Sequence, residues 1–208
     1  MKRAAILFVG VALVMWCARE VQAAEMICFE AEAVTNVVAP FEVVSVAKDV
    51  SGGKCLKIAE GANKSGGNGT NGYAVADVLP VATNTNKACE VLSKVAPKGS
   101  VQFTFRVKKT KRYVMWCRVR WDNVCGNSFS AAIDDALPFT FGQNATYKKW
   151  HWVQAPPRLK QLKLSKGVHT LTIKNREDGI MIDQIIFTSS RRLIPVGVET
   201  ATVAVSVK

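Results

Sequence analysis

The sequence lacks the residue patterns that usually mark an enzyme centre or a zinc site. Its 208 residues include only two histidines, and neither belongs to a recognisable motif with a serine or cysteine nucleophile. A catalytic triad is therefore not supported. No CxxC pair and no cysteine–histidine zinc pattern occurs, so a structural zinc is not expected. These absences favour a binding or structural protein over an enzyme.

Long helical patterns and domain linkers are missing as well. Short runs rich in Val, Ile, Phe, Tyr and Trp recur between turn-like segments, and only residues 87–95 have room for a turn or two of helix. Residues 101–107 alternate apolar and polar side chains, as a half-buried strand does. The expected strands span 28–33, 42–47, 55–59, 72–78, 101–107, 113–121, 128–133, 151–153, 161–164, 169–174 and 180–188. Many short strands predict an all-β fold, a β-sandwich or jelly roll, in one domain over 24–194.

The first 23 residues have the organisation of a secretory signal. Lys2 and Arg3 precede an apolar run from Ala4 to Trp16, and Val21-Gln22-Ala23 supplies the small residues of a cleavage site. The apolar run is shorter than the roughly 20 residues that span a bilayer. We therefore expect no membrane span, and a mature protein that begins near Ala24 and is secreted, periplasmic or held at the cell surface.

Basic residues outnumber acidic ones, 28 against 16, for a formal net charge of +12. Cleavage of the signal would remove three positive charges and one negative charge, which leaves about +10. The basic residues cluster at Arg106–Arg112, Lys148-Lys149, Arg158–Lys166 and Arg191-Arg192. Such clusters attract polyanions. For an exported protein an anionic polysaccharide or surface is a better match than nucleic acid, and a solvated surface that maintains solubility is the alternative.

Five cysteines remain after the signal: Cys28, Cys55, Cys89, Cys117 and Cys125. In an oxidising compartment an odd number leaves one thiol free or paired between chains, and the sequence does not give the connectivity. Cys117 and Cys125 lie closest together and could close a local loop.

Residues 167–187 contain two β-type runs, 169–174 and 180–187, around the turn-rich break 175–179. This pattern predicts an antiparallel hairpin. Asp183 is a lone carboxylate in the apolar second run. A buried charge of this kind requires a cation or hydrogen-bond donors.

Two further carboxylates, Glu30 and Glu32, are two residues apart on the first expected strand and so share one face of it. If that strand lies beside the one that carries Asp183, three carboxylates converge. Such an oxygen cluster suits Ca²⁺. The alternative is that both glutamates face solvent.

Several motifs together resemble carbohydrate-binding modules of families 6 and 35. They are FEAE (Phe29–Glu32), SGGKCL (Ser51–Leu56), YVMWCRV (Tyr113–Val119), LSKGVHTLTI (Leu164–Ile173) and IDQIIF (Ile182–Phe187). GNSF (Gly126–Phe129), WHW (Trp150–Trp152) and NREDG (Asn175–Gly179) are similar to a related group attached to secreted bacterial polysaccharide-degrading proteins. The resemblance covers nearly the whole mature chain and implies a galactose-binding-like β-jelly roll. It also implies a structural, non-catalytic Ca²⁺ between the first and last strands, held by Glu30, Glu32 and Asp183 with backbone oxygens near Ser51 and Gly52.

The same resemblance implies a sugar site in which loop aromatics stack on pyranose faces and polar side chains fix the hydroxyls. The ligand-binding candidates are Tyr73, Trp121, Asn123, Asn127, Trp150, Trp152 and Arg176, with Asp122 and Asn144 as further polar partners. A tryptophan in a β-protein is more often packed than exposed, and Arg176, flanked by Glu177 and Asp178, could instead form a structural ion pair. Family 6 modules commonly carry Asn where this chain has Met181, so the usual cleft is expected to be altered or lost.

The remaining polar residues suggest no second chemistry. Asp134-Asp135 follows an expected strand and has the pattern of a turn, whereas glycoside hydrolysis requires two carboxyls that face each other across a cleft. His169 alternates with apolar residues and is expected to be packed or at a sheet edge.

The leading functional prediction is a secreted, non-catalytic module that binds a polysaccharide or glycan and accompanies a polysaccharide-degrading enzyme or a cell-surface protein. The alternative is an extracellular structural or adhesion protein that uses the jelly roll for protein contacts. Residues 195–208 follow the module pattern as an extra strand or tail, and residues 200–208 could otherwise pair with the edge of another chain. The break at Pro195-Val196-Gly197 predicts that a chain ending near Ile194 still folds.

Overall fold

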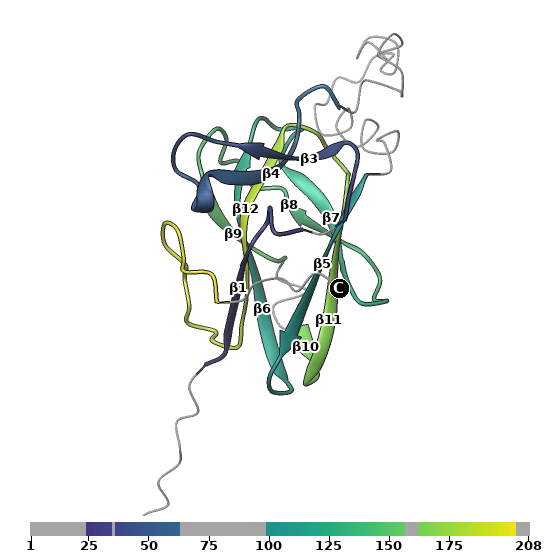
Figure 1. Ribbon diagram of the computed structural model, residues 1–208, viewed down its shortest axis with the longest axis vertical. Helices are drawn as coiled ribbons and strands as arrows, with labels where there is room; N and C mark the ends of the chain where they lie inside the picture. The colour runs from purple at the N-terminus through teal and green to yellow at the C-terminus, as the bar shows by residue number, and fades with distance from the viewer. Residues whose placement is uncertain (1–23, 35, 63–98, 157–161, 203–208) are drawn as a thin grey trace, which may run out of the picture.

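Twelve β-strands and one short 3-10 turn make up the described part of this computed structural model, residues 24–34, 36–62, 99–156 and 162–202 (Figure 1). The elements are β1 (Met26–Glu30), β2 (Asn36–Val38), β3 (Phe41–Ser45), η1 (Ser51–Gly53), β4 (Lys54–Ile58), β5 (Ser100–Val107), β6 (Lys111–Trp121), β7 (Ser128–Ile133), β8 (Phe139–Gly142), β9 (His151–Gln154), β10 (Leu162–Leu164), β11 (Gly167–Lys174) and β12 (Ile180–Thr188). The predicted signal 1–23, strand 72–78 and helix 87–95 lie outside the described residues.

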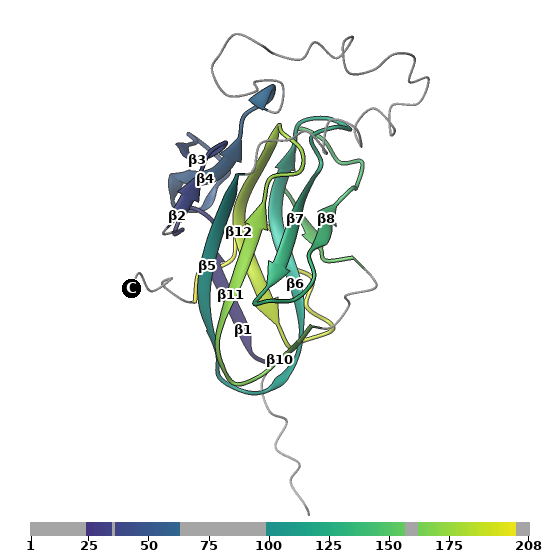
Figure 2. The same cartoon turned by 90° about the vertical axis from the view of Figure 1, so that its right-hand side faces the viewer.

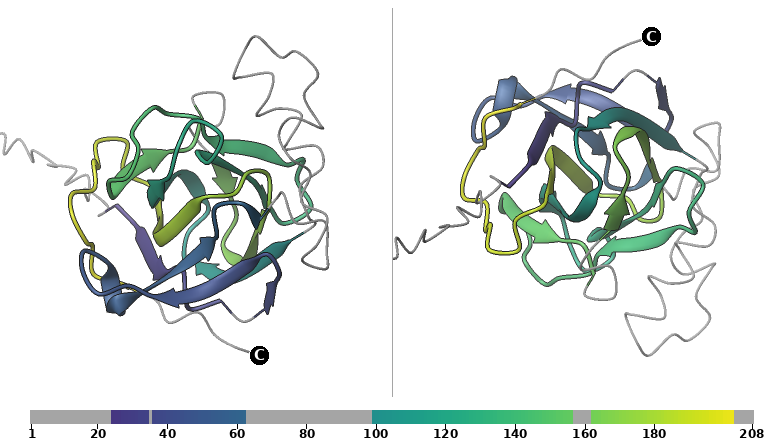
Figure 3. Two further views of the ribbon diagram at one scale, coloured as in Figure 1. Left: turned by 90° about the horizontal axis from the view of Figure 1, so that it is seen from above. Right: turned by 90° about the horizontal axis from the view of Figure 1, so that it is seen from below.

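The strands form two antiparallel sheets that face each other (Figures 2 and 3). The large sheet has the order β10-β6-β12-β4-β3, with β1 on β12 and β9 on β6, and the small sheet has the order β2-β5-β11-β7-β8. The predicted all-β jelly-roll sandwich is confirmed. Within the described residues, no helix is both long and apolar enough to cross a membrane.

The core lies between the sheets and follows from the alternation of side chains along each strand. Along β5 every second residue is buried, so Phe103 and Phe105 point inward while their neighbours face solvent. Phe105 stacks on Phe187 of β12 with 4.5 Å between ring centroids, and Phe29 of β1 packs against both of them. Aromatic contacts across the sandwich thus connect strands from both ends of the chain.

The predicted hairpin of 169–174 and 180–187 is wrong, because the two strands lie in different sheets. β11 pairs with β5 and β7, whereas β12 pairs with β1, β4 and β6. The intervening loop crosses the edge of the sandwich and is held there by the buried Glu177, whose Oε2 accepts the Asn127 backbone N–H at 3.1 Å. A polar break between two strands gives the same sequence signal for a hairpin and for a crossing between sheets.

The suggested Cys117–Cys125 pairing is also wrong. Cys125 is disulfide-bonded, but Cys117 of β6 is a free thiol in the core, and Cys28 of β1 and Cys55 of β4 are also free and buried. Burial raises the pKa of Cys28 and of Cys55 to about 12, so both stay protonated. Cys89 lies outside the described residues.

After β12 the chain runs back over the outside of the large sheet as a segment without regular structure, residues 189–202, which we call the strap. Gln184 on β12 donates to the Glu199 carbonyl at 2.7 Å and accepts the Glu199 N–H at 2.9 Å. Thr202 donates its backbone N–H to the Cys28 carbonyl at 2.9 Å and accepts the Cys28 N–H on its hydroxyl. The expected extra strand is not formed over 195–202, and 203–208 lie outside the described residues.

Candidate functional site

The site is organised by a gap along one edge of β12. That edge pairs first with β4, over Ile180–Ile182, and then with β1, over Gln184–Thr188. On the opposite edge the register with β6 shifts between Ile182 and Gln184, as at a β-bulge. Asp183 occupies this gap, and its carbonyl accepts the Ala31 N–H at 2.8 Å.

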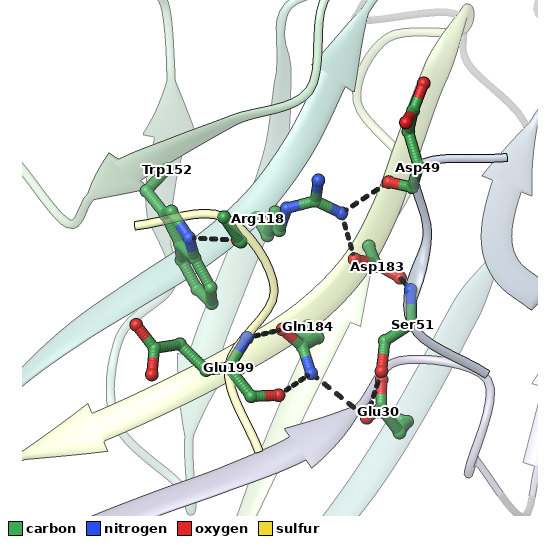
Figure 4. A network of polar contacts seen from close by, with 9 residues as sticks. Glu30, Asp49, Ser51, Arg118, Trp152, Asp183, Gln184 and Glu199 are labelled. Carbon is green, nitrogen blue, oxygen red and sulfur yellow. Dashed lines mark hydrogen bonds and ion pairs between the residues drawn. The ribbon is translucent and has the colours of Figure 1, made fainter. Parts of the chain in front are cut away.

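A polar network spreads from Asp183 beneath the outer face of the large sheet (Figure 4). The Asp183 carboxylate accepts the Ser51 N–H at 2.9 Å and a hydrogen bond from the Arg118 guanidinium, with which it forms a buried ion pair. Ser51 Oγ and Gln184 Nε2 both donate to Glu30 Oε1, at 2.7 and 3.0 Å. Burial raises the pKa of Asp183, although the hydrogen bonds from Arg118 and Ser51 oppose this effect.

The convergence predicted for the calcium ligands is partly visible in this network. Glu30 Oε2 and Glu32 Oε2 are buried without a hydrogen-bond partner in the described part of the chain. Burial raises the pKa of Glu32 to about 7, and the charges of Glu30 and Asp183 add to the effect. Gly52 has a positive φ of 59°, which favours glycine, and its Cα lies so close to Glu32 that an added Cβ would come within 2.9 Å of Oε1.

These donors suit a hard cation in type, but the set is incomplete. The ion pair with Arg118 already takes one oxygen of Asp183. No group of three or more His, Cys, Asp or Glu among the described residues is arranged to hold a metal ion. Glu30 and Glu32, with backbone oxygens near Ser51, are the groups that would hold a Ca²⁺.

Beside the network the outer face of the large sheet opens into a pocket of about 560 Å³, which we call the basic pocket. It is lined by Val46, Lys48, Asp49, Arg118, Arg120, Lys148, Lys149, Trp150 and Met181. Five of these nine residues are cationic and one is acidic. Arg118 and Arg120 alternate with core residues of β6 and so point outward, and the turn before β9 supplies Lys148 and Lys149.

Arg118 forms the rigid wall of the basic pocket. Its Nη1 donates to the Asp49 carbonyl at 2.8 Å as well as to Asp183. The guanidinium carbon lies 5.3 Å from the ring centroid of Trp150. This cation–π contact holds the Trp150 ring with one of its faces against Arg118. Arg120 is less constrained, because its guanidinium makes only one hydrogen bond with the described residues, a weak one of 3.6 Å to the Met181 sulfur.

Of the predicted sugar-binding aromatics among the described residues, only Trp150 lines the basic pocket. Trp121 is fully buried and packs on Phe129, and its Nε1 donates to Asn144 at 2.5 Å. No sugar can stack on it, so this assignment is corrected: Trp121 is a core residue. Trp152 donates its Nε1 to the Gly197 carbonyl at 2.9 Å and so holds the strap. Tyr73 lies outside the described residues.

The predicted polar partners lie at the upper end of the sandwich, in turns that they stabilise. Asn123 donates to Glu60 at 3.1 Å and accepts the Cys125 N–H at 2.8 Å. Asn127 is buried. Arg176 forms hydrogen bonds to Ser128 and Glu177, which is the structural ion pair that the sequence left as an alternative.

Two smaller expectations are confirmed. Asp134 and Asp135 form a turn after β7, and His169 is buried. His169 Nδ1 lies 2.7 Å from Asp134 Oδ2, and its Nε2 lies 2.9 Å from the Ser165 carbonyl. Burial would raise the pKa of Asp134, but hydrogen bonds from His169 and the Thr170 N–H lower it overall.

Solved structures place this architecture among known folds. The chain aligns with a β-(1,4)-mannanase of Podospora anserina that combines GH26 and CBM35, at TM-score 0.51 and 16% identity over 82% of this chain and 29% of the mannanase. It also aligns with a family 35 carbohydrate-binding module from Clostridium thermocellum, at TM-score 0.50 and 8% identity over 80% of this chain and 99% of the module.

The chain has the fold of a carbohydrate-binding module. A third match, the C-terminal family 6 module of a laminarinase from Zobellia galactanivorans, has TM-score 0.48 and 12% identity and covers 79% of this chain and 99% of the module. The resemblance inferred from the motifs is thus confirmed at the level of the fold. No protein-family model and no curated protein sequence matches this chain.

Proposed function

We propose that this carbohydrate-binding-module fold is a non-catalytic, secreted module that binds an acidic polysaccharide in the basic pocket. The observation that carries the proposal is the combination of an aromatic wall, Trp150, with five cationic side chains in one pocket of about 560 Å³. An aromatic ring offers a pyranose an apolar face, and arginine pairs with carboxylate or sulfate through two parallel hydrogen bonds.

The chemistry of the pocket favours an anionic over a neutral ligand. Arg120 is half-buried and keeps most of its donors available, whereas Arg118 is already engaged by Asp183 and Asp49. Lys148 and Lys149 are exposed and add long-range attraction. Arg120 would therefore bind the acid group directly, while the lysines raise the local concentration of the polymer.

A calcium ion at the Asp183 gap remains part of the proposal. Its support is the pair of buried carboxylate oxygens without partners, Glu30 Oε2 and Glu32 Oε2. When bound, the ion would neutralise these carboxylates and tie β1 to η1. Glu30 and Glu32 are not among the residues that line the pocket, so the role of the ion would be structural.

The test compares binding of polygalacturonate with binding of the same polymer after reduction of its carboxyl groups, measured by titration calorimetry. We expect Trp150→Ala to weaken binding about fivefold at every salt concentration, which corresponds to the roughly 1 kcal/mol of a stacked ring. Arg120→Gln should weaken binding mainly at low salt, because screening already reduces its contribution at high salt.

Lys174→Gln, an exposed cation at the end of β11 in the small sheet, is the matched control and should bind like the parent chain. Equal affinity for the acidic and the reduced polymer would discard the anionic assignment. Absence of binding to any polysaccharide, together with capture of one specific protein, would favour the structural or adhesion role instead.

A further inference from the structure

The lower end of the sandwich, away from the basic pocket, brings two turns side by side (Figure 1, bottom; Figure 3, right). One turn joins β5 to β6 and the other joins β10 to β11. Gly167 pairs with Val107, and Leu164 pairs with Lys111, so both turns are fixed in register. The Lys166 N–H donates to Thr110 Oγ1 at 2.9 Å and ties them together.

These turns concentrate positive charge, and we call the cluster the basic tip. Its members are Lys108, Lys109, Lys111, Arg112, Lys163 and Lys166, of which all but the half-exposed Lys111 are exposed. Within the described residues, none of them forms an ion pair. Glu25 reaches this end, but its two carboxylate oxygens accept the Lys108 N–H at 2.8 Å and the Tyr113 hydroxyl at 2.7 Å.

The register makes this charge unfavourable for folding. Lys163 and Arg112 lie directly opposite each other on β10 and β6. Like charges in facing positions of a sheet destabilise it. An ordinary solvated surface would mix both signs, whereas here the repulsion goes uncompensated by any carboxylate ion pair in the described part of the chain.

We propose that the basic tip is a second binding surface for the same acidic polysaccharide, so that one long polymer contacts both the tip and the basic pocket. The ligand class rests on the proposed function. β6 connects the two sites: Arg112 and Arg118 lie six residues apart on its outward face, roughly 20 Å along an extended strand. A polymer long enough to span this distance gains affinity because its second contact is intramolecular.

The experiment measures binding of polygalacturonate fractions of increasing length to the parent chain and to three variants. These are the tip variant Arg112→Gln/Lys163→Gln, the pocket variant Trp150→Ala, and the control Lys174→Gln, which removes an exposed cation at the other end of β11. For the parent chain affinity should rise steeply once the polymer spans both sites. The affinity of the tip variant should be about tenfold lower for long polymers at low salt and unchanged for short oligomers. The pocket variant should lose affinity at every length.

Thermal melting at low salt separates binding from folding. The tip variant should melt at a higher temperature than the parent chain, because the facing charges are gone. A lower melting temperature, or a length dependence equal to that of the parent chain, would overturn the proposal. If the tip variant loses binding of short oligomers and the pocket variant does not, the proposed function is overturned, whereas the tip remains a binding surface. Binding of no fraction at all would overturn both, and tighter binding of duplex DNA would assign the tip to nucleic acid.

Discussion

Two carboxylate oxygens, Glu30 Oε2 and Glu32 Oε2, lie buried without a hydrogen-bond partner in the described part of the chain. The folded state raises the pKa of Glu32 from 4.5 to about 7, so it binds a proton more tightly than the unfolded chain does. The free energy of unfolding therefore decreases as pH rises from about 4.5 to about 7. Stability from this group is fully present below pH 4.5 and is lost above pH 7.

This shift predicts opposite effects of Glu32→Gln with and without calcium. In chelator at pH 8 the substitution removes a charge that is costly to bury, so the melting temperature should rise. With excess calcium the parent chain should gain stability by mass action and the variant should gain less. Differential scanning calorimetry of both proteins, each with chelator and with calcium, measures this. An identical response to calcium in the two proteins would contradict a site at Glu32.

At the level of single residues, the sequence predicted which types of side chain matter better than where they point. Glu30, Asp183 and Trp150 lie at the site, because a lone carboxylate in an apolar strand and a tryptophan in a loop are readable patterns. Trp121 was misassigned because a tryptophan at the end of a strand gives the same signal whether it faces the core or a ligand. Arg118 and Arg120 were missed, although their alternation with core residues of β6 indicated an outward face.

Among the elements, most strand positions followed from alternation and β-branched runs, but their pairing did not. β2 and β8, of three and four residues, were missed, although β10 and β9 have the same lengths and were predicted. β11 and β12 were expected to pair with each other, although each has both edges occupied by other strands. Periodicity reports which face of a strand is buried, whereas pairing depends on contacts between segments far apart in the sequence.

The strap is the element whose role differs most from expectation. Gln184 is fully buried, and its amide makes two hydrogen bonds with the backbone of Glu199. A chain ending at Ile194 would lose these bonds and those between Thr202 and Cys28. We predict that the truncated chain still folds, as the sequence indicates, but that its free energy of unfolding is lower by about 1 to 3 kcal/mol. Urea denaturation measures it.

A chain ending at Thr202 is the matched control, because it keeps every described contact of the strap. It should unfold at the same urea concentration as the full chain. If the chain ending at Ile194 does so too, the strap contributes nothing to stability and this prediction is wrong.

On the scale of the whole molecule, the formal net charge of +12 acts on folding and on binding with opposite signs. Like charges repel in the compact state, and acidic polymers are attracted. Raising the salt concentration from about 0.01 to 0.15 M shortens the Debye length from about 30 to 8 Å. We therefore expect the melting temperature to rise and the affinity for polygalacturonate to fall over this range. If the melting temperature falls together with the affinity, specific ion pairs rather than net charge dominate stability.

The position of β12 in the large sheet has a consequence for how the chain folds. β12 lies between β6 on one edge and β1 and β4 on the other, and it follows all three in the sequence. The pairing of Met26 with Thr188 joins segments from nearly opposite ends of the described chain. Non-local pairings of this kind slow folding, because a large loop must close before any contact is gained. While β12 is still inside the ribosome, a nascent chain lacks the strand that joins β6 to β1 and β4, so the large sheet cannot form until β12 has left the ribosome.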